Sequence, residues 1–185
     1  MSISGVSSYS IPQIQALTTQ EIRSLDSTEI SSLSSTQLNA LNFEQIAAIG
    51  TDEIKSIASD TIAQLSVDQI FNLITDQIAA LGTDQVGALT TAQVQALQLE
   101  DIEVLSTAQV RAWNANQLVA LTTDQISHLG TAQLASMTPA KLAAIEPEDI
   151  AQLTTDQIKA ISTTQVASMT TAQLAKLSSD HVAAL

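Results

Sequence analysis

The chain of 185 residues contains no cysteine, and aromatic side chains make up only 2% of it. Without cysteine there is no disulfide framework and no thiolate metal site. Hydrophobic residues still make up 45% of the sequence, so any core must be built from aliphatic side chains. No apolar run approaches the roughly 18 residues that span a bilayer. The first ten residues lack the basic and apolar regions of a cleaved signal peptide.

Cationic residues are also scarce. The sequence contains six Lys and Arg against 19 Asp and Glu, which gives a net charge of −13. The six cations are spread along the chain without clustering: Arg23, Lys55, Arg111, Lys141, Lys159 and Lys176. A phosphate backbone or an anionic membrane surface would be repelled by this charge. The composition therefore predicts no nucleic-acid partner and no membrane insertion.

An uninterrupted eight-residue repeat fills the chain, with 22 octads from residue 9 to residue 184. In the octad 121–128, Leu-Thr-Thr-Asp-Gln-Ile-Ser-His, positions one and six are apolar, and this holds along the array. Self-similarity at a fixed period predicts an array in which each repeat packs only on its neighbours. We expect residues 1–8 to be a lead-in and residues 9–185 to form a single array.

The octad pattern predicts a short helix that is capped at its start. A continuous helix would let the apolar stripe drift around its axis, and a strand would place positions one and six on opposite faces. Position two carries a capping residue in 18 of 22 octads, and position five is Glu or Gln in 17 of 22. This spacing is a capping box, as in Thr18 with Glu21, Ser34 with Gln37 and Thr122 with Gln125. Positions one and six then form the hydrophobic staple.

Each octad is therefore predicted to be a helix of about six residues, and the chain an all-α solenoid or superhelix of such helices. Larger residues at position eight (Val104, His128, Gln152 and Lys176) recur every 24 residues, which indicates about three octads per superhelical turn. The glycines at position two (Gly50, Gly82 and Gly130) are separated by multiples of 16, which would suit two or four octads per turn instead. Positions one and six should form the core, represented by Leu17, Ile22, Leu89, Val94, Trp113, Leu121 and Ile126.

No group of residues forms a recognisable catalytic or metal-binding motif. His128 and His181 are 53 residues apart, and neither has a second histidine at ligand spacing. Six successive octads carry an acid at position four: Glu44, Asp52, Asp60, Asp68, Asp76 and Asp84. These acids suit the positive ends of their own helices, and a calcium ladder is the alternative. We expect no enzyme activity, no cofactor and no metal.

Two further features bear on binding. Position three is Ser or Thr in 15 of 22 octads, which is typical of an exposed helix start. An ice- or carbohydrate-binding array is the alternative, although Phe43, Val67 and Leu99 interrupt the row. Phe71 and Val119 lie at position seven, which otherwise carries small, polar or charged residues, so we expect them to be exposed and to contact a partner.

The units Leu-Thr-Thr-Asp-Gln-Ile (121–126 and 153–158) and Leu-Thr-Thr-Ala-Gln-Val (89–94) resemble short tandem repeats of long secreted or surface-associated bacterial proteins. The resemblance implies a non-enzymatic stalk, spacer or protein-binding scaffold. It also implies export without a cleaved N-terminal signal, with a cytoplasmic location as the alternative. Neither end of the array carries an evident polar cap, so we expect binding of a protein, or self-association, through the array ends, with a longer natural chain as the alternative.

Overall fold

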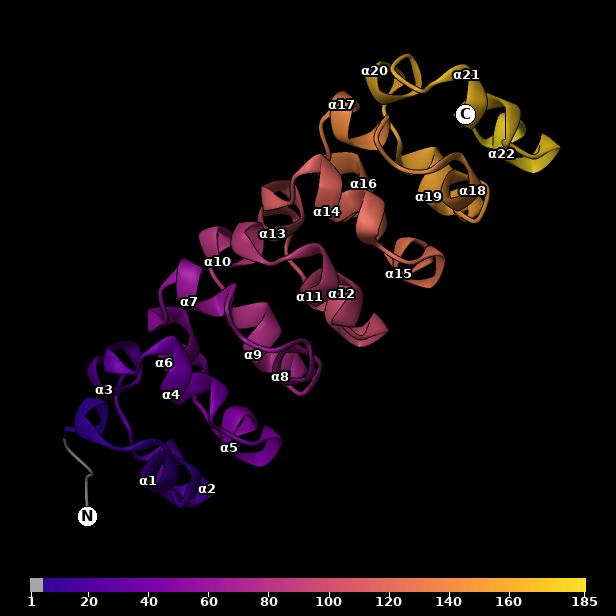
Figure 1. Ribbon diagram of the computed structural model, residues 1–185. Helices are drawn as coiled ribbons and strands as arrows, with labels where there is room; N and C mark the ends of the chain where they lie inside the picture. Colours follow the sequence, from indigo (N-terminus) through magenta and orange to yellow (C-terminus); the bar gives the residue numbers. More distant parts are fainter. Residues whose placement is uncertain (1–4) are drawn as a thin grey trace. The chain divides into compact units, whose positions relative to one another are not determined.

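The computed structural model describes residues 5–185, and within this range it contains helices and no strands. It divides into two compact units, one up to Leu97 and the other Gln98–Leu185, which are described separately. The all-helical architecture agrees with the prediction from the octad pattern. In each unit, short helices follow one another directly (Figure 1).

The first unit contains one short 3-10 helix and eleven α-helices. Their bounds are η1 (Val6–Ser8), α1 (Ile11–Gln15), α2 (Thr19–Arg23), α3 (Ser27–Ser32), α4 (Ser35–Asn39), α5 (Phe43–Ala47), α6 (Thr51–Ser56), α7 (Ser59–Ile62), α8 (Val67–Phe71), α9 (Thr75–Ala80), α10 (Thr83–Ala88) and α11 (Thr91–Ala96).

The second unit contains eleven α-helices of the same kind. Their bounds are α12 (Leu99–Val104), α13 (Thr107–Ala112), α14 (Ala115–Ala120), α15 (Thr123–Ser127), α16 (Thr131–Ser136), α17 (Pro139–Leu142), α18 (Pro147–Ile150), α19 (Thr155–Ala160), α20 (Thr163–Val166), α21 (Thr171–Ala175) and α22 (Ser179–Ala184).

Each helix begins where the octad pattern predicts. In α2 the Thr18 hydroxyl accepts a hydrogen bond from the Glu21 amide at 3.2 Å, and the Glu21 carboxylate accepts one from the Thr18 amide at 2.8 Å. The boxes of Ser34 with Gln37 and Thr122 with Gln125 are likewise formed. Pro139 and Pro147 occupy the first helical position, where a missing N–H costs nothing. Local capping therefore explains the length of four to six residues per helix.

Helices three apart in the chain pack against each other in both units. In the first unit α3 packs on α6, α6 on α9, α5 on α8 and α7 on α10. In the second unit α12, α15, α18 and α21 pack in succession, and α13, α16, α19 and α22 do the same. Val104, His128, Gln152 and Lys176 lie at the C-terminal ends of α12, α15, α18 and α21. The packing thus agrees with the three octads per turn that their spacing indicates.

Aliphatic side chains from octad positions one and six fill the interior of each unit. Ile22, Val94 and Ile126 at position six are at most 1% exposed, and Leu89 and Leu121 at position one are 4% exposed. Leu17 differs from this pattern because it is only half-buried. It lies in the first superhelical turn, where neighbouring helices cover one side of the residue less completely.

Trp113 is the largest fully buried side chain of the described residues and takes the position that leucine holds in most octads. Its indole Nε1 is buried and has no hydrogen-bond partner within residues 5–185. The side chain therefore contributes apolar packing at the cost of one unsatisfied donor.

Among the described residues, no helix has the length and apolar character that crossing a membrane requires.

Candidate functional site

The glutamine at octad position five forms hydrogen bonds in two directions. Gln77 is fully buried, and its Oε1 accepts a hydrogen bond from the Ile74 amide at 2.9 Å, which completes the start of α9. Its Nε2 donates to the carbonyls of Ile46 and Ile49 at 2.9 and 2.7 Å, in the preceding superhelical turn. One side chain therefore caps its own helix and joins two turns.

We call such residues bridging glutamines. Their Nε2 atoms donate to carbonyls 28 and 30 or 31 residues earlier, and they are Gln37, Gln45, Gln69, Gln77, Gln85, Gln93, Gln133, Gln157, Gln165 and Gln173. The capping-box interpretation of the sequence did not include this second role. The sequence indicates this second role only by its preference for glutamine. A capping box accepts Glu as readily as Gln, yet position five holds 14 Gln and three Glu.

Two other residue types at position five show what the site requires. The Lys141 Nζ donates to the carbonyl of Arg111 in the preceding turn, so the donor is preserved. Burial, and then the nearby Arg111 charge, lower the pKa of Lys141. Asp149 cannot donate, and its Oδ1 instead accepts a hydrogen bond of 2.6 Å from the Thr123 hydroxyl. The side chain at position five thus binds the preceding turn in both cases, as a donor in Lys141 and as an acceptor in Asp149.

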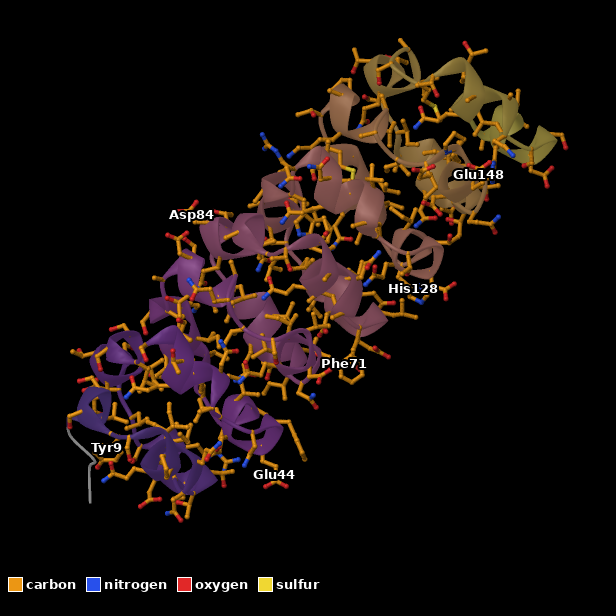
Figure 2. All side chains as sticks on the ribbon, in the orientation of Figure 1. Tyr9, Glu44, Phe71, Asp84, His128 and Glu148 are labelled. Carbon is orange, nitrogen blue, oxygen red and sulfur yellow. The ribbon has the colours of Figure 1, made fainter. Side chains whose placement is uncertain are left out.

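The acids at position four do not form a line. They lie on six consecutive helices, α5 to α10, so successive acids step around the superhelix. Figure 2 shows Glu44 and Asp84, the first and last of them, at opposite edges of the first unit. Residues 5–185 contain no group of three or more Asp, Glu or His side chains arranged to hold a metal ion. Asp52 pairs with Lys55 of its own helix at 3.2 Å.

The hydroxyls at position three are arranged in columns, because helices three apart are stacked. In the second unit one column is uninterrupted: Thr107, Thr131, Thr155 and Ser179 begin the stacked helices α13, α16, α19 and α22. All four residues are exposed. This column is the part of the structure that comes nearest to the hydroxyl array considered as an alternative.

Both histidines lie at helix ends. His128 Nδ1 lies 2.8 Å from the carbonyl oxygen of Asp124 and 3.2 Å from the hydroxyl of Ser127, at the end of α15. His181 is 7% exposed and takes the glutamine position in α22, where its amide donates to the Ser178 hydroxyl at 3.1 Å. Both side chains therefore have contacts that belong to helix ends.

Exposed large apolar side chains gather on α5 and α8 of the first unit. Phe43 and Val67 begin these two stacked helices and are 60% and 45% exposed. Phe71 lies one helical turn beyond Val67 on the same face of α8 and is 50% exposed. Its ring projects outward from α8 in Figure 2. We call Phe43, Val67 and Phe71 the lateral patch.

An open groove of about 320 Å³ adjoins the lateral patch, and its walls include Phe43, Leu41, Ser66 and Asn72. The sequence predicts an exposed Phe71, whereas it shows Phe43 and Val67 only as interruptions of the hydroxyl row. Their spacing of 24 residues, which is one superhelical turn, was the signal that joins them. Val119, the other predicted contact, is 45% exposed on α14 in the second unit.

Comparison with protein families gives a match to the ALTTAQ repeat. Its model matches residues 72–99, 94–131, 126–163 and 150–185, which together are more than half of the chain. The search of curated proteins gave no significant match. The match agrees with the tandem-repeat interpretation of the sequence.

Proposed function

Since the chain belongs to the ALTTAQ repeat family, we propose that it is a non-enzymatic structural repeat module that binds a protein through its side. The observation that carries the proposal is the lateral patch. Three large apolar side chains from two stacked helices are 45–60% exposed together. Elsewhere on this exterior the same octad positions carry mostly small or polar residues, so the patch marks a difference in function between repeats.

The repeat itself supports the non-enzymatic part of the proposal. The capping residues bind their own helix starts, and the bridging glutamines bind the preceding turn. Such a framework holds a surface in a fixed geometry, as a spacer or scaffold requires. An apolar cluster of aromatic and branched side chains on a rigid helical face suits the centre of a protein interface.

Site-specific photocrosslinking in the native host tests the lateral patch. A photoreactive amino acid at position 71 should give a discrete protein adduct. The same amino acid at Ala79, the exposed residue at the same octad position in α9, is the matched control. The adduct should disappear when Phe43→Ser is added. Equal labelling from positions 71 and 79 would contradict the proposal.

The resemblance of the Leu-Thr-Thr-x-Gln units to repeats of secreted bacterial proteins supports an extracellular or cell-surface location for the module. Cell fractionation with an antibody to the chain tests this part, with recovery only in the cytoplasm as the opposing result. We also propose that another protein, or a second copy, binds at the array ends, independently of binding at the lateral patch.

A hydroxyl-mediated carbohydrate array is the second candidate function. The uninterrupted column of Thr107, Thr131, Thr155 and Ser179 favours it, since four exposed hydroxyls follow one another on stacked helices. Retention on immobilised polysaccharides should fall when Thr131 and Thr155 are both changed to Val. Unchanged retention, or no retention of the original chain, would remove this candidate.

A further inference from the structure

Carboxylates border the lateral patch on both of its helices. Glu44 follows Phe43 in α5, and Asp68 holds the same octad position in α8. Both acids are exposed, and we call them the border acids. Figure 2 shows Glu44 and Phe71 at the same edge of the first unit. The outer surface of α5 and α8 therefore combines apolar side chains with negative charge.

The border acids are not neutralised by the chain itself. In α6 the position-four acid Asp52 pairs with Lys55, three residues later, at 3.2 Å. In α5 and α8 the place of that lysine is taken by Ala47 and Phe71. Within residues 5–185 no cation forms an ion pair with either border acid. Residues 1–97 contain ten acidic side chains and two basic ones, so the surroundings add further negative charge.

The groove beside the lateral patch has one of these acids in its wall. Its lining combines Leu41 and Phe43 with Asp68 and with the side-chain amides of Asn39, Gln69 and Asn72. Each amide already donates a hydrogen bond of 2.7–2.8 Å to a backbone carbonyl of the chain. The Asp68 carboxylate makes no hydrogen bond with residues 5–185. An apolar side chain with a cation beside it therefore complements the groove.

We propose that the lateral patch docks a basic segment of a partner protein, with an apolar side chain of that segment in the groove and lysine or arginine side chains paired with Glu44 and Asp68. The inference rests on the proposed function, and it adds the chemistry of the partner. The groove volume is about 320 Å³. One turn of an α-helix, about 10 Å wide and about 5.4 Å high, fills roughly 420 Å³. The groove therefore takes a side chain and not a whole helix.

Charge decides against other occupants of this surface. A second copy of this chain has a net charge of −13, and its six cations are scattered along the sequence, so it offers no basic segment. An anionic membrane or a phosphorylated peptide is repelled by the border acids. A neutral apolar segment would cover the patch but would strip water from two carboxylates without supplying a counter-charge. A basic segment with an apolar residue meets both requirements.

Three synthetic peptides of equal length test the proposal. The first alternates lysine with leucine and phenylalanine, the second replaces its lysines by glutamate, and the third replaces its apolar residues by serine. Fluorescence anisotropy at roughly 0.15 M salt measures their binding to the original chain. The first peptide should bind at least about tenfold more tightly than either of the others, and Phe43→Ser/Phe71→Ser should abolish its binding. Equal binding of the first peptide and either other peptide would overturn the proposal.

Variants of the chain locate the charge that matters. Glu44→Gln/Asp68→Asn should weaken binding of the first peptide about tenfold. The matched control, Asp60→Asn/Asp84→Asn, removes the same charge from exposed position-four residues of α7 and α10 and should leave binding nearly unchanged. Circular dichroism confirms that both variants fold. Equal weakening by the two pairs would overturn the proposal.

Photocrosslinking separates this inference from the proposed function. The adduct formed from position 71 should diminish in Glu44→Gln/Asp68→Asn. An undiminished adduct would overturn the basic partner and leave the lateral patch as a protein-binding surface. The absence of any adduct from the original chain would overturn both.

Discussion

The side-chain amide of Gln93 donates to the carbonyl of Leu65, 28 residues earlier, with an Nε2–O distance of 2.8 Å. The same amide reaches Ile62 at 3.0 Å, while Oε1 accepts the Thr90 amide at 2.8 Å. Gln93 is 1% exposed, so these bonds form away from water. The start of one helix and the end of another, a full superhelical turn apart, are thus fixed by a single side chain.

Replacing a bridging glutamine by glutamate should destabilise the first unit strongly. Gln77→Glu keeps the acceptor for the Ile74 amide but loses the donor to Ile46 and Ile49 and buries a charge. We expect a loss of roughly 3–5 kcal/mol in the free energy of unfolding, measured with urea. Gln13→Glu is the control because Gln13 is exposed in the first turn, and it should change stability little. Equal effects at both positions would show that the hydrogen bonds of the bridging glutamines do not stabilise the fold.

The capping residues should contribute in proportion to the hydrogen bonds they make. The Thr90 hydroxyl accepts the Gln93 amide at 3.2 Å, so Thr90→Ala should cost roughly 0.5–2 kcal/mol. Ile74 holds the same octad position without a side-chain acceptor and is 47% exposed. Ile74→Thr should therefore stabilise by roughly 0.5–2 kcal/mol. Thermal unfolding followed by far-UV circular dichroism measures both changes, and a loss of stability in Ile74→Thr would contradict the cap assignment.

A charge in the core should unfold the repeats around it. Val94 at position six is fully buried, so Val94→Asp places an unpaired carboxylate among aliphatic side chains and should cost at least roughly 4 kcal/mol. Leu89→Asp, at 4% exposure, should act in the same way. Val67→Asp makes the same change on the lateral patch and should leave the helical signal intact. A folded Val94→Asp protein would contradict the assignment of the core.

Acid should weaken the fold through carboxylates that are better stabilised when folded. The hydrogen bond from Lys176 and its charge lower the pKa of Glu148 below its ordinary value of 4.5, and the two side chains lie 3.0 Å apart. Below that value the unfolded state binds more protons than the folded state, so this stabilisation is present above about pH 4.5 and is lost as the pH falls through the folded pKa. Glu148→Gln should reduce the fall in Tm between about pH 5 and about pH 3.

That variant should have nearly the original Tm near neutral pH, because both side chains of this ion pair are largely exposed and screened by water. The melting temperature across the same pH range measures both expectations. An identical acid response in the variant and the original chain would show that Glu148 does not take part.

Amino-acid spacing within one octad determined most of the fold. Capping bonds join residues three apart, such as Thr18 and Glu21, so they can be predicted from local order in the chain. The 24-residue spacing from Val104 to Lys176 also indicated which helices stack. These features follow from short-range geometry, which every octad repeats.

Tertiary structure decided the remaining features. The amide of a bridging glutamine and its acceptors are separated by about 30 residues, so their meeting depends on the pitch that packing gives the superhelix. The same stacking brings Phe43 beside the helix that carries Val67 and Phe71. Neither of the two octads indicates an exposed apolar patch by itself. The sequence therefore determined how each helix starts and ends, and only the packing of turns decided which side chains act together.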